Sequence, residues 1–161
     1  MIQRIQSVFL ALIIIIIATL CGIDVLHLVY VEPDKKTTEY FLNLFYFNVK
    51  VNGVLTESNL QLPLIILASV IMGLSVYTLV SFKNRIRQMQ FTLINLILII
   101  LLIITFSVKA ILFVPNFSSD KMMLNSVWGI ALFIFCLYLI IRVYYLIRKD
   151  EDLVRSADRI R

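Results

Sequence analysis

The sequence predicts an all-α membrane protein: a four-transmembrane-helix bundle with a short β-hairpin in its outer loop and a helical cytoplasmic C-terminal extension. The first observation is composition, because 61% of the 161 residues are hydrophobic, 16% are charged and the mean hydropathy is +0.96. A soluble domain is less apolar and carries more charge. The second observation is the spacing of charges, which leaves four uncharged stretches of 19 to 25 residues: 5–23, 58–82, 88–108 and 122–141. A helix needs roughly 20 residues to cross a hydrocarbon core of about 30 Å.

Soluble and β-barrel alternatives fit these stretches poorly. Four buried core helices would leave a soluble chain with too little polar surface to cover its outside. Barrel strands are about 10 residues long and alternate in polarity, whereas residues 13–17 and 96–106 are apolar on every side. The first stretch has a basic start, as a secretion signal has, but its apolar part is too long and no small-x-small cleavage site follows. We therefore expect a retained first helix.

The expected organisation is a single membrane domain, 1–161, with spans at about 7–30, 60–82, 90–113 and 122–147. An outer loop (31–59) joins the first two spans, and a cytoplasmic tail (148–161) follows the last. Within the loop, apolar residues alternate with polar ones from Phe45 to Val51, and Asn52-Gly53 then favours a type I′ turn. This pattern predicts the hairpin, with its apolar face on the helix ends or at the headgroups.

Basic residues indicate the orientation. Ten lie on the side of both termini and the 81–90 turn, and five lie on the other side. The ten are Arg4, Lys83, Arg85, Arg87, Arg142, Arg148, Lys149, Arg155, Arg159 and Arg161. The positive-inside rule makes this side cytoplasmic, with both termini inside. The net charge of +5 then signals orientation, and no nucleic-acid partner is needed to explain it.

The charged C-terminal segment, 149–161, has two interpretations. Oppositely charged residues three or four positions apart, such as Glu151 and Arg155, are typical of a solvated helix. One interpretation is an amphipathic extension that anchors the fourth helix at the headgroups. The other is a docking surface for a cytoplasmic protein or an anionic lipid. The residues assigned to that surface are Lys83, Arg85, Arg87, Arg155, Arg159 and Arg161.

Three ionisable residues, Asp24, His27 and Lys109, fall near the outer ends of the first and third spans. Helix rise places Asp24 and Lys109 at matching depth, and His27 is one turn beyond Asp24. The trio is interpreted as an interhelical ion pair, or alternatively as a proton relay or ligand site. One histidine and one carboxylate are too few for a metal site. Asn95 is expected to form an interhelical hydrogen bond.

The two ends of the chain carry a resemblance. MIQRIQS at 1–7 and LVRSADRIR at 153–161 resemble a family of four-helix integral membrane proteins of Bacteroidetes-type bacteria, domain of unknown function 4293. The resemblance implies a multi-pass protein of the inner membrane of a Gram-negative cell. It implies no assigned activity, so no catalytic residues are carried over.

The function expected is that of a non-enzymatic scaffold or subunit of a membrane complex, with the lipid bilayer and a membrane or cytoplasmic protein as partners. The alternative is a small transporter or channel component that uses Asp24, His27 and Lys109. A membrane enzyme on lipid substrates would need an acid, base or nucleophile cluster that the outer loop lacks. We expect no catalytic, cofactor-binding or metal-binding residues and no cofactor, and the oligomeric state stays open.

Overall fold

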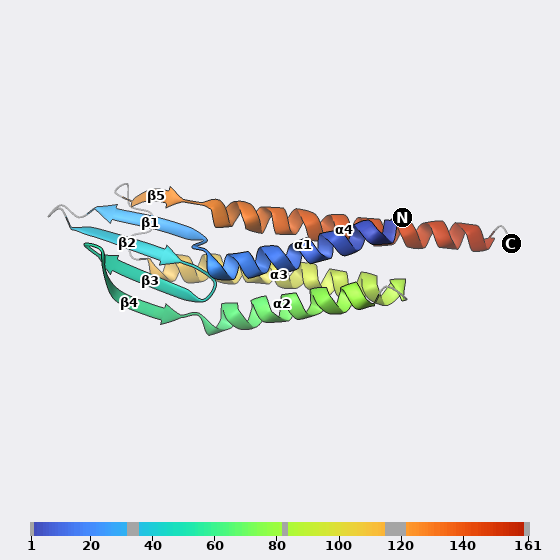
Figure 1. The fold of residues 1–161 in the computed structure, drawn as a ribbon, viewed down its shortest axis with the longest axis horizontal. Coiled ribbons are helices and arrows are strands. Elements are labelled where there is room, and N and C mark those ends of the chain that lie inside the picture. The colour runs from blue at the N-terminus through green and yellow to red at the C-terminus, as the bar shows by residue number, and fades with distance from the viewer. Residues whose placement is uncertain (1, 32–35, 82–83, 115–121, 160–161) are drawn as a thin grey trace.

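A computed structural model describes residues 2–31, 36–81, 84–114 and 122–159, and within them it contains four long helices and one sheet (Figure 1). The helices are α1 (Ile2–Gly22), α2 (Leu62–Val80), α3 (Arg85–Phe113) and α4 (Trp128–Arg159). The strands are β1 (Leu26–Val31), β2 (Thr37–Leu42), β3 (Tyr46–Val51), β4 (Val54–Leu60) and β5 (Met122–Ser126). The helices lie side by side along the long axis, and the sheet lies at one end of the bundle, where the end of α3 reaches alongside it.

The helices pack as a four-membered ring. Each contacts its neighbours in the order α1, α2, α3, α4, and α4 closes the ring against α1. This order places α1 and α3 diagonally across the bundle. The start of α1, the α2–α3 connection and the end of α4 all lie at the end remote from the sheet, where α4 extends past the other helices (Figure 1).

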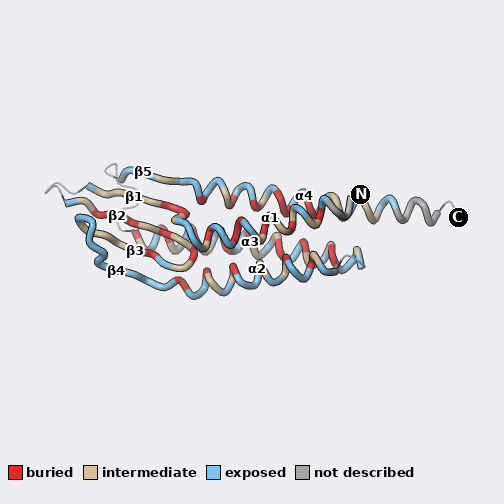
Figure 2. Tube along the Cα trace, in the orientation of Figure 1, coloured by how far each residue is buried: buried red, intermediate tan, exposed pale blue. Residues whose placement is uncertain are grey.

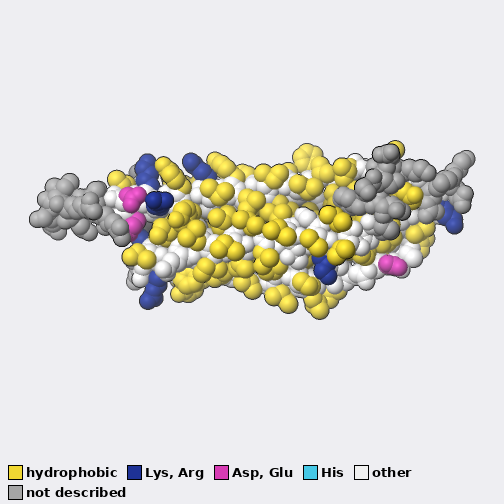
Figure 3. All heavy atoms as spheres, turned by 180° about the vertical axis from the view of Figure 1, so that it is seen from behind, with side chains coloured by type: hydrophobic (Ala, Val, Ile, Leu, Met, Phe, Trp, Pro, Cys, Tyr) yellow, Lys and Arg dark blue, Asp and Glu magenta, His cyan; other side chains and the backbone are white. Residues whose placement is uncertain are grey.

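All four helices are long and apolar enough to cross a membrane. Large apolar side chains face outward along them, for example Ile97 at 63% exposure, Leu112 at 78% and Ile134 at 64%. In the view of Figure 3, this apolar surface covers the middle of the molecule, and most of the charged side chains gather near its ends. A soluble monomer rarely exposes a continuous apolar surface of this kind.

The prediction of an all-α protein with one short hairpin is wrong. The protein contains a five-stranded antiparallel sheet in the order β4-β3-β2-β1-β5. Residues 26–30, assigned to the first span from the sequence, belong to strand β1, and residues 122–126, assigned to the fourth span, form strand β5. The physical reason is that the backbone beyond the helix ends needs hydrogen-bond partners, and pairing between the two connections at this end supplies them.

The predicted hairpin exists as β3 and β4 within this larger sheet. Asn52 and Gly53 both have positive φ, 52° and 81°, as a type I′ turn requires. The side chain of Asn52 also accepts a hydrogen bond of 3.1 Å from the backbone N–H of Thr37 on β2. The turn therefore holds the hairpin to the next strand.

The sheet packs one face against the outer end of α3. Phe47 of β3 is fully buried, and its ring centroid lies 5.8 Å from that of Phe106 and 5.3 Å from that of Phe113, both on α3. Burial is concentrated in β1 to β3 and along inward helix faces, whereas β4 is exposed throughout (Figure 2). The opposite sheet face, which carries His27 and Phe41, points away from the helices.

A second close contact joins α4 to the α1–β1 connection. Gly129, the second residue of α4, has no room for a side chain, because a Cβ there would overlap the Cα of Val25 and lie 2.7 Å from its Cγ1. Val25 is itself fully buried. The absence of a side chain at Gly129 therefore allows the start of α4 to approach the connection at the end of α1 closely.

Candidate functional site

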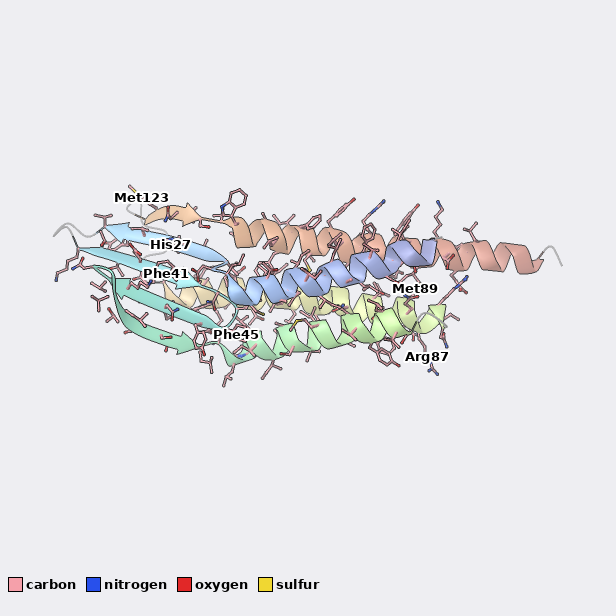
Figure 4. The ribbon with its side chains drawn as sticks, in the orientation of Figure 1. His27, Phe41, Phe45, Arg87, Met89 and Met123 are labelled. Carbon is pink, nitrogen blue, oxygen red and sulfur yellow. The ribbon has the colours of Figure 1, made fainter. Side chains whose placement is uncertain are left out.

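The outward sheet face carries a stack of side chains across three strands. The His27 ring of β1 lies on the Phe41 ring of β2, with centroids 4.1 Å apart and planes inclined by 19°. Lys50 of β3 places its Nζ 4.4 Å from the centroid of the same Phe41 ring, within range of a cation–π contact. His27 and Phe41 are register partners on adjacent strands (Figure 4). Phe41 is therefore held between a histidine and a cation.

His27 also connects β1 to β5. Its Nδ1 lies 3.0 Å from the side-chain amide nitrogen of Asn125. An amide nitrogen can only donate a hydrogen bond, so Nδ1 is the acceptor. The opposite nitrogen, Nε2, then carries the proton and faces Glu39 Oε2 at 3.8 Å, beyond hydrogen-bond distance. A bulge in the β1–β5 pairing between His27 and Leu28 accommodates Asn125 as the extra residue.

The structure does not assemble Asp24, His27 and Lys109 into one group. Among the described residues, Arg85 forms an ion pair with Asp150 and His27 Nε2 lies 3.8 Å from Glu39 Oε2, and neither contact includes Asp24 or Lys109. Asp24 lies between α1 and β1, while Lys109 lines a groove beside the start of α2. The trio was predicted from equal depth along the helices; α1 and α3 lie diagonally across the bundle, and the trio stays a prediction.

At the end remote from the sheet, one residue of the expected basic surface is engaged. Arg85 contacts Asp150 of α4 twice, through Nε to Oδ2 at 3.3 Å and through Nη1 to the backbone oxygen at 3.2 Å. Arg87 is exposed (Figure 4). Lys83 and Arg161 fall outside the described residues. Arg155 and Arg159 lie on the final turns of α4, where the backbone alone is described.

The sequence reasoning missed a buried polar stripe in the half of the bundle remote from the sheet. Its residues come from three helices and are all at most 5% exposed: Gln6, Ser75, Thr78, Gln88, Thr92 and Asn95. The predicted interhelical hydrogen bond of Asn95 is confirmed, because its Nδ2 donates to Ser75 Oγ at 2.7 Å. Two buried atoms, Gln6 Nε2 and Asn95 Oδ1, have no hydrogen-bond partner among the described residues.

A pattern in the sequence points to this stripe. Gln88, Thr92 and Asn95 are spaced four and three residues apart, so they share one face of α3. The same face continues toward the sheet with apolar residues, beginning with Ile99 and Leu102. The inward face of α3 is thus polar in the half remote from the sheet and apolar in the half near it. Polar residues at such interfaces hold membrane helices together by hydrogen bonds.

These features define a class of protein: four helices of membrane-spanning length whose connections at one end build a single shared sheet. The described residues contain no cluster of three or more His, Cys, Asp or Glu side chains able to hold a metal ion.

The sequence model of the family described as "Domain of unknown function (DUF4293)" matches residues 2–160, and the chain belongs to this family. The resemblance noted at the two chain ends is thereby confirmed at the level of the family. Comparisons with curated proteins and with solved structures found no match.

Proposed function

We propose that the protein is an integral protein of the bacterial inner membrane, with both termini in the cytoplasm and the sheet on the periplasmic side. The observation that carries this proposal is the outward-facing apolar surface of the four helices, such as Ile15 at 58% exposure on α1 and Ile104 at 54% on α3. Lipid is the solvent that stabilises such side chains. A protein in water would bury them.

The distribution of charge supports the orientation. Arg87, Arg148 and Lys149 are all exposed at the end remote from the sheet, where the start of α1 and the end of α4 also lie. Lysine and arginine accumulate on cytoplasmic segments of membrane proteins. The same rule places the sheet across the membrane from the termini.

Within the membrane, we propose a non-enzymatic role as a scaffold or subunit of a complex. The sheet offers a partner an outward face with His27, Phe41 and Lys50, and an edge strand, β4, that is exposed along all seven residues. An edge strand has unpaired backbone groups that can add a strand from another protein.

A transport role has weaker support. It would use Asp24, His27 and Lys109 together, and no salt bridge within the described residues joins any two of them. The buried polar stripe supplies polar lining in one half of the bundle, but the inward positions of α3 from Ile99 to Ala110 are apolar. Hydrogen bonding between helices accounts for the stripe without a transported ligand.

Membrane insertion and orientation are tested by cysteine labelling in whole cells. The two native cysteines, Cys21 and Cys136, are replaced by serine, and single cysteines are placed at Glu57 on β4 or Arg87 on α3, both exposed. An impermeant maleimide should label position 57 once the outer membrane is permeabilised, and position 87 after the inner membrane is opened. Equal labelling of both positions, or recovery of the chain in the soluble fraction without detergent, would refute the proposal.

The scaffold role is tested by photo-crosslinking. A photoreactive residue at Glu57 on the exposed edge should yield a discrete protein adduct, whereas the same residue at Ile97, which is 63% exposed on α3, should label lipid. If Glu57 forms no protein adduct when the chain is at native abundance, the scaffold role loses its basis.

A further inference from the structure

A groove opens where the sheet meets the helices. It has a volume of about 470 Å³ and lies between the end of β4, the start of α2 and the end of α3. Its apolar walls include Leu60, Leu62, Leu112 and Phe113, and Asn59 and Gln61 add polar groups. Leu112 is 78% exposed and Leu62 is 57% exposed, so the groove is open to the surroundings of the bundle.

Lys109 is the one charged residue among those that line the groove. No salt bridge involves Lys109 within the described part of the chain, where Arg85 pairs with Asp150 and His27 Nε2 lies 3.8 Å from Glu39 Oε2. A cation in a groove with apolar walls favours an anionic ligand, because a partly desolvated charge costs less free energy when it is paired with an opposite charge.

The groove lies at the depth of lipid headgroups. Lys109 is 24 residues beyond Arg85 on the continuous helix α3, which corresponds to about 36 Å of helix. The hydrocarbon core is about 30 Å thick. With Arg85 at one headgroup layer, Lys109 therefore reaches the other, and Leu112 lies on the following turn.

We infer that this groove is a binding site for an anionic phospholipid from the leaflet on the sheet side. The headgroup phosphate pairs with Lys109, and an acyl chain runs from there toward the bilayer centre past the exposed side chain of Leu62. This inference rests on the proposed membrane insertion.

The lining also selects among headgroups. A zwitterionic lipid brings an ammonium group together with its phosphate, and none of the residues found to line the groove is acidic. An anionic lipid, such as phosphatidylglycerol, presents no cation that needs a partner. The preference should therefore follow headgroup charge rather than chain length.

The test measures lipid-dependent stability of the purified full-length protein in detergent. Cys136 is fully buried on α4, so its reaction with a thiol-reactive dye on heating reports unfolding, in a Cys21→Ser background. Phosphatidylglycerol should raise the midpoint more than phosphatidylcholine, because a ligand that binds the folded state stabilises it. Lys109→Gln should weaken the apparent affinity for phosphatidylglycerol about fivefold. Lys109→Arg should retain it.

Lys50→Gln is the matched control. It removes a cation on the sheet, 4.4 Å from the Phe41 ring and outside the groove, and should leave the phosphatidylglycerol effect unchanged. Equal losses in Lys50→Gln and Lys109→Gln would overturn the inference, as would an equal response to phosphatidylcholine. An equal response to glycerol 3-phosphate alone would do the same, since it would assign the site to a soluble phosphate. A protein that fractionates with membranes yet shows no lipid preference would overturn this inference and leave the proposed function intact.

Discussion

Gly129→Ala should destabilise the folded protein by about 1 to 3 kcal/mol, the usual cost of adding a methyl group to a filled site. The new Cβ would overlap the Cα of Val25 and lie 2.7 Å from its Cγ1 and 2.8 Å from its Cβ. Ordinary carbon contacts are about 3.5 to 4.0 Å, so α4 or the α1–β1 connection would have to shift by about 1 Å. Gly129 is part of helix α4, and alanine has a higher helix propensity than glycine. This difference offsets part of the cost.

Gly73→Ala is the internal control for this prediction. Gly73 is exposed in the middle of α2, and a Cβ there meets no atom within 4 Å among the described residues. Alanine should therefore stabilise the helix by up to about 1 kcal/mol. Both variants are compared by the midpoint of Cys136 labelling on heating in a Cys21→Ser background. The packing argument is refuted if Gly129→Ala melts at or above the parent temperature.

Three further changes test separate contacts. A double-mutant cycle of Asn95→Ala and Ser75→Ala should give a coupling of about 0.6 to 1.7 kcal/mol in the same thermal assay; additive losses would exclude their 2.7 Å hydrogen bond. Replacing Asp150 by Asn should cost at most about 1 kcal/mol and lose its effect at high salt, because the Arg85–Asp150 pair is partly exposed. Gly53→Ala should cost about 1 to 2 kcal/mol at φ 81° and speed proteolysis of the β3–β4 turn, whereas unchanged cleavage would contradict that strain.

The helices could be predicted from the sequence because the requirement that shapes them is local. A membrane-spanning helix needs an uninterrupted apolar stretch of about 20 residues, and the gaps between charges contain that information directly. All four predicted spans correspond to helices that are long and apolar enough to cross a membrane. The Asn52-Gly53 turn was predictable for the same reason, since two adjacent residues determine it.

The five-stranded sheet could not be predicted from the sequence, because its pairing depends on residues far apart in the chain. β1 has the sequence LHLVYV, which is apolar enough to continue the first span, and β5 has the sequence MMLNS, which precedes the fourth span without a charge. Neither segment indicates its partner. Their pairing, for example Val29 with Met123, joins two connections separated by the entire α2–α3 hairpin.

For the candidate site residues too, the local features could be predicted from the sequence and the contacts between distant segments could not. Helix rise gives the depth of Asp24 and Lys109, but the direction in which each residue points depends on which helices are neighbours. The pair suggested by equal depth therefore stays a prediction, since α1 and α3 are not neighbours in the ring of helices. The polar stripe that includes Gln88 and Asn95 was present as a spacing on one helix face, and it could have been found.

The α1–α2 connection supplies four strands of the sheet, β1 to β4, and the α3–α4 connection supplies the fifth, β5. β5 pairs within the described residues only with β1, so its place in the sheet depends on the position of β1. Packing of α1 against α4 holds the ends of both connections close together, which lowers the entropy lost when β1 and β5 pair. The Gly129–Val25 contact and the His27–Asn125 contact lie at this junction. A change that moves α4 relative to α1 should therefore also displace β5 relative to β1, so the sheet responds to helix packing in the bundle.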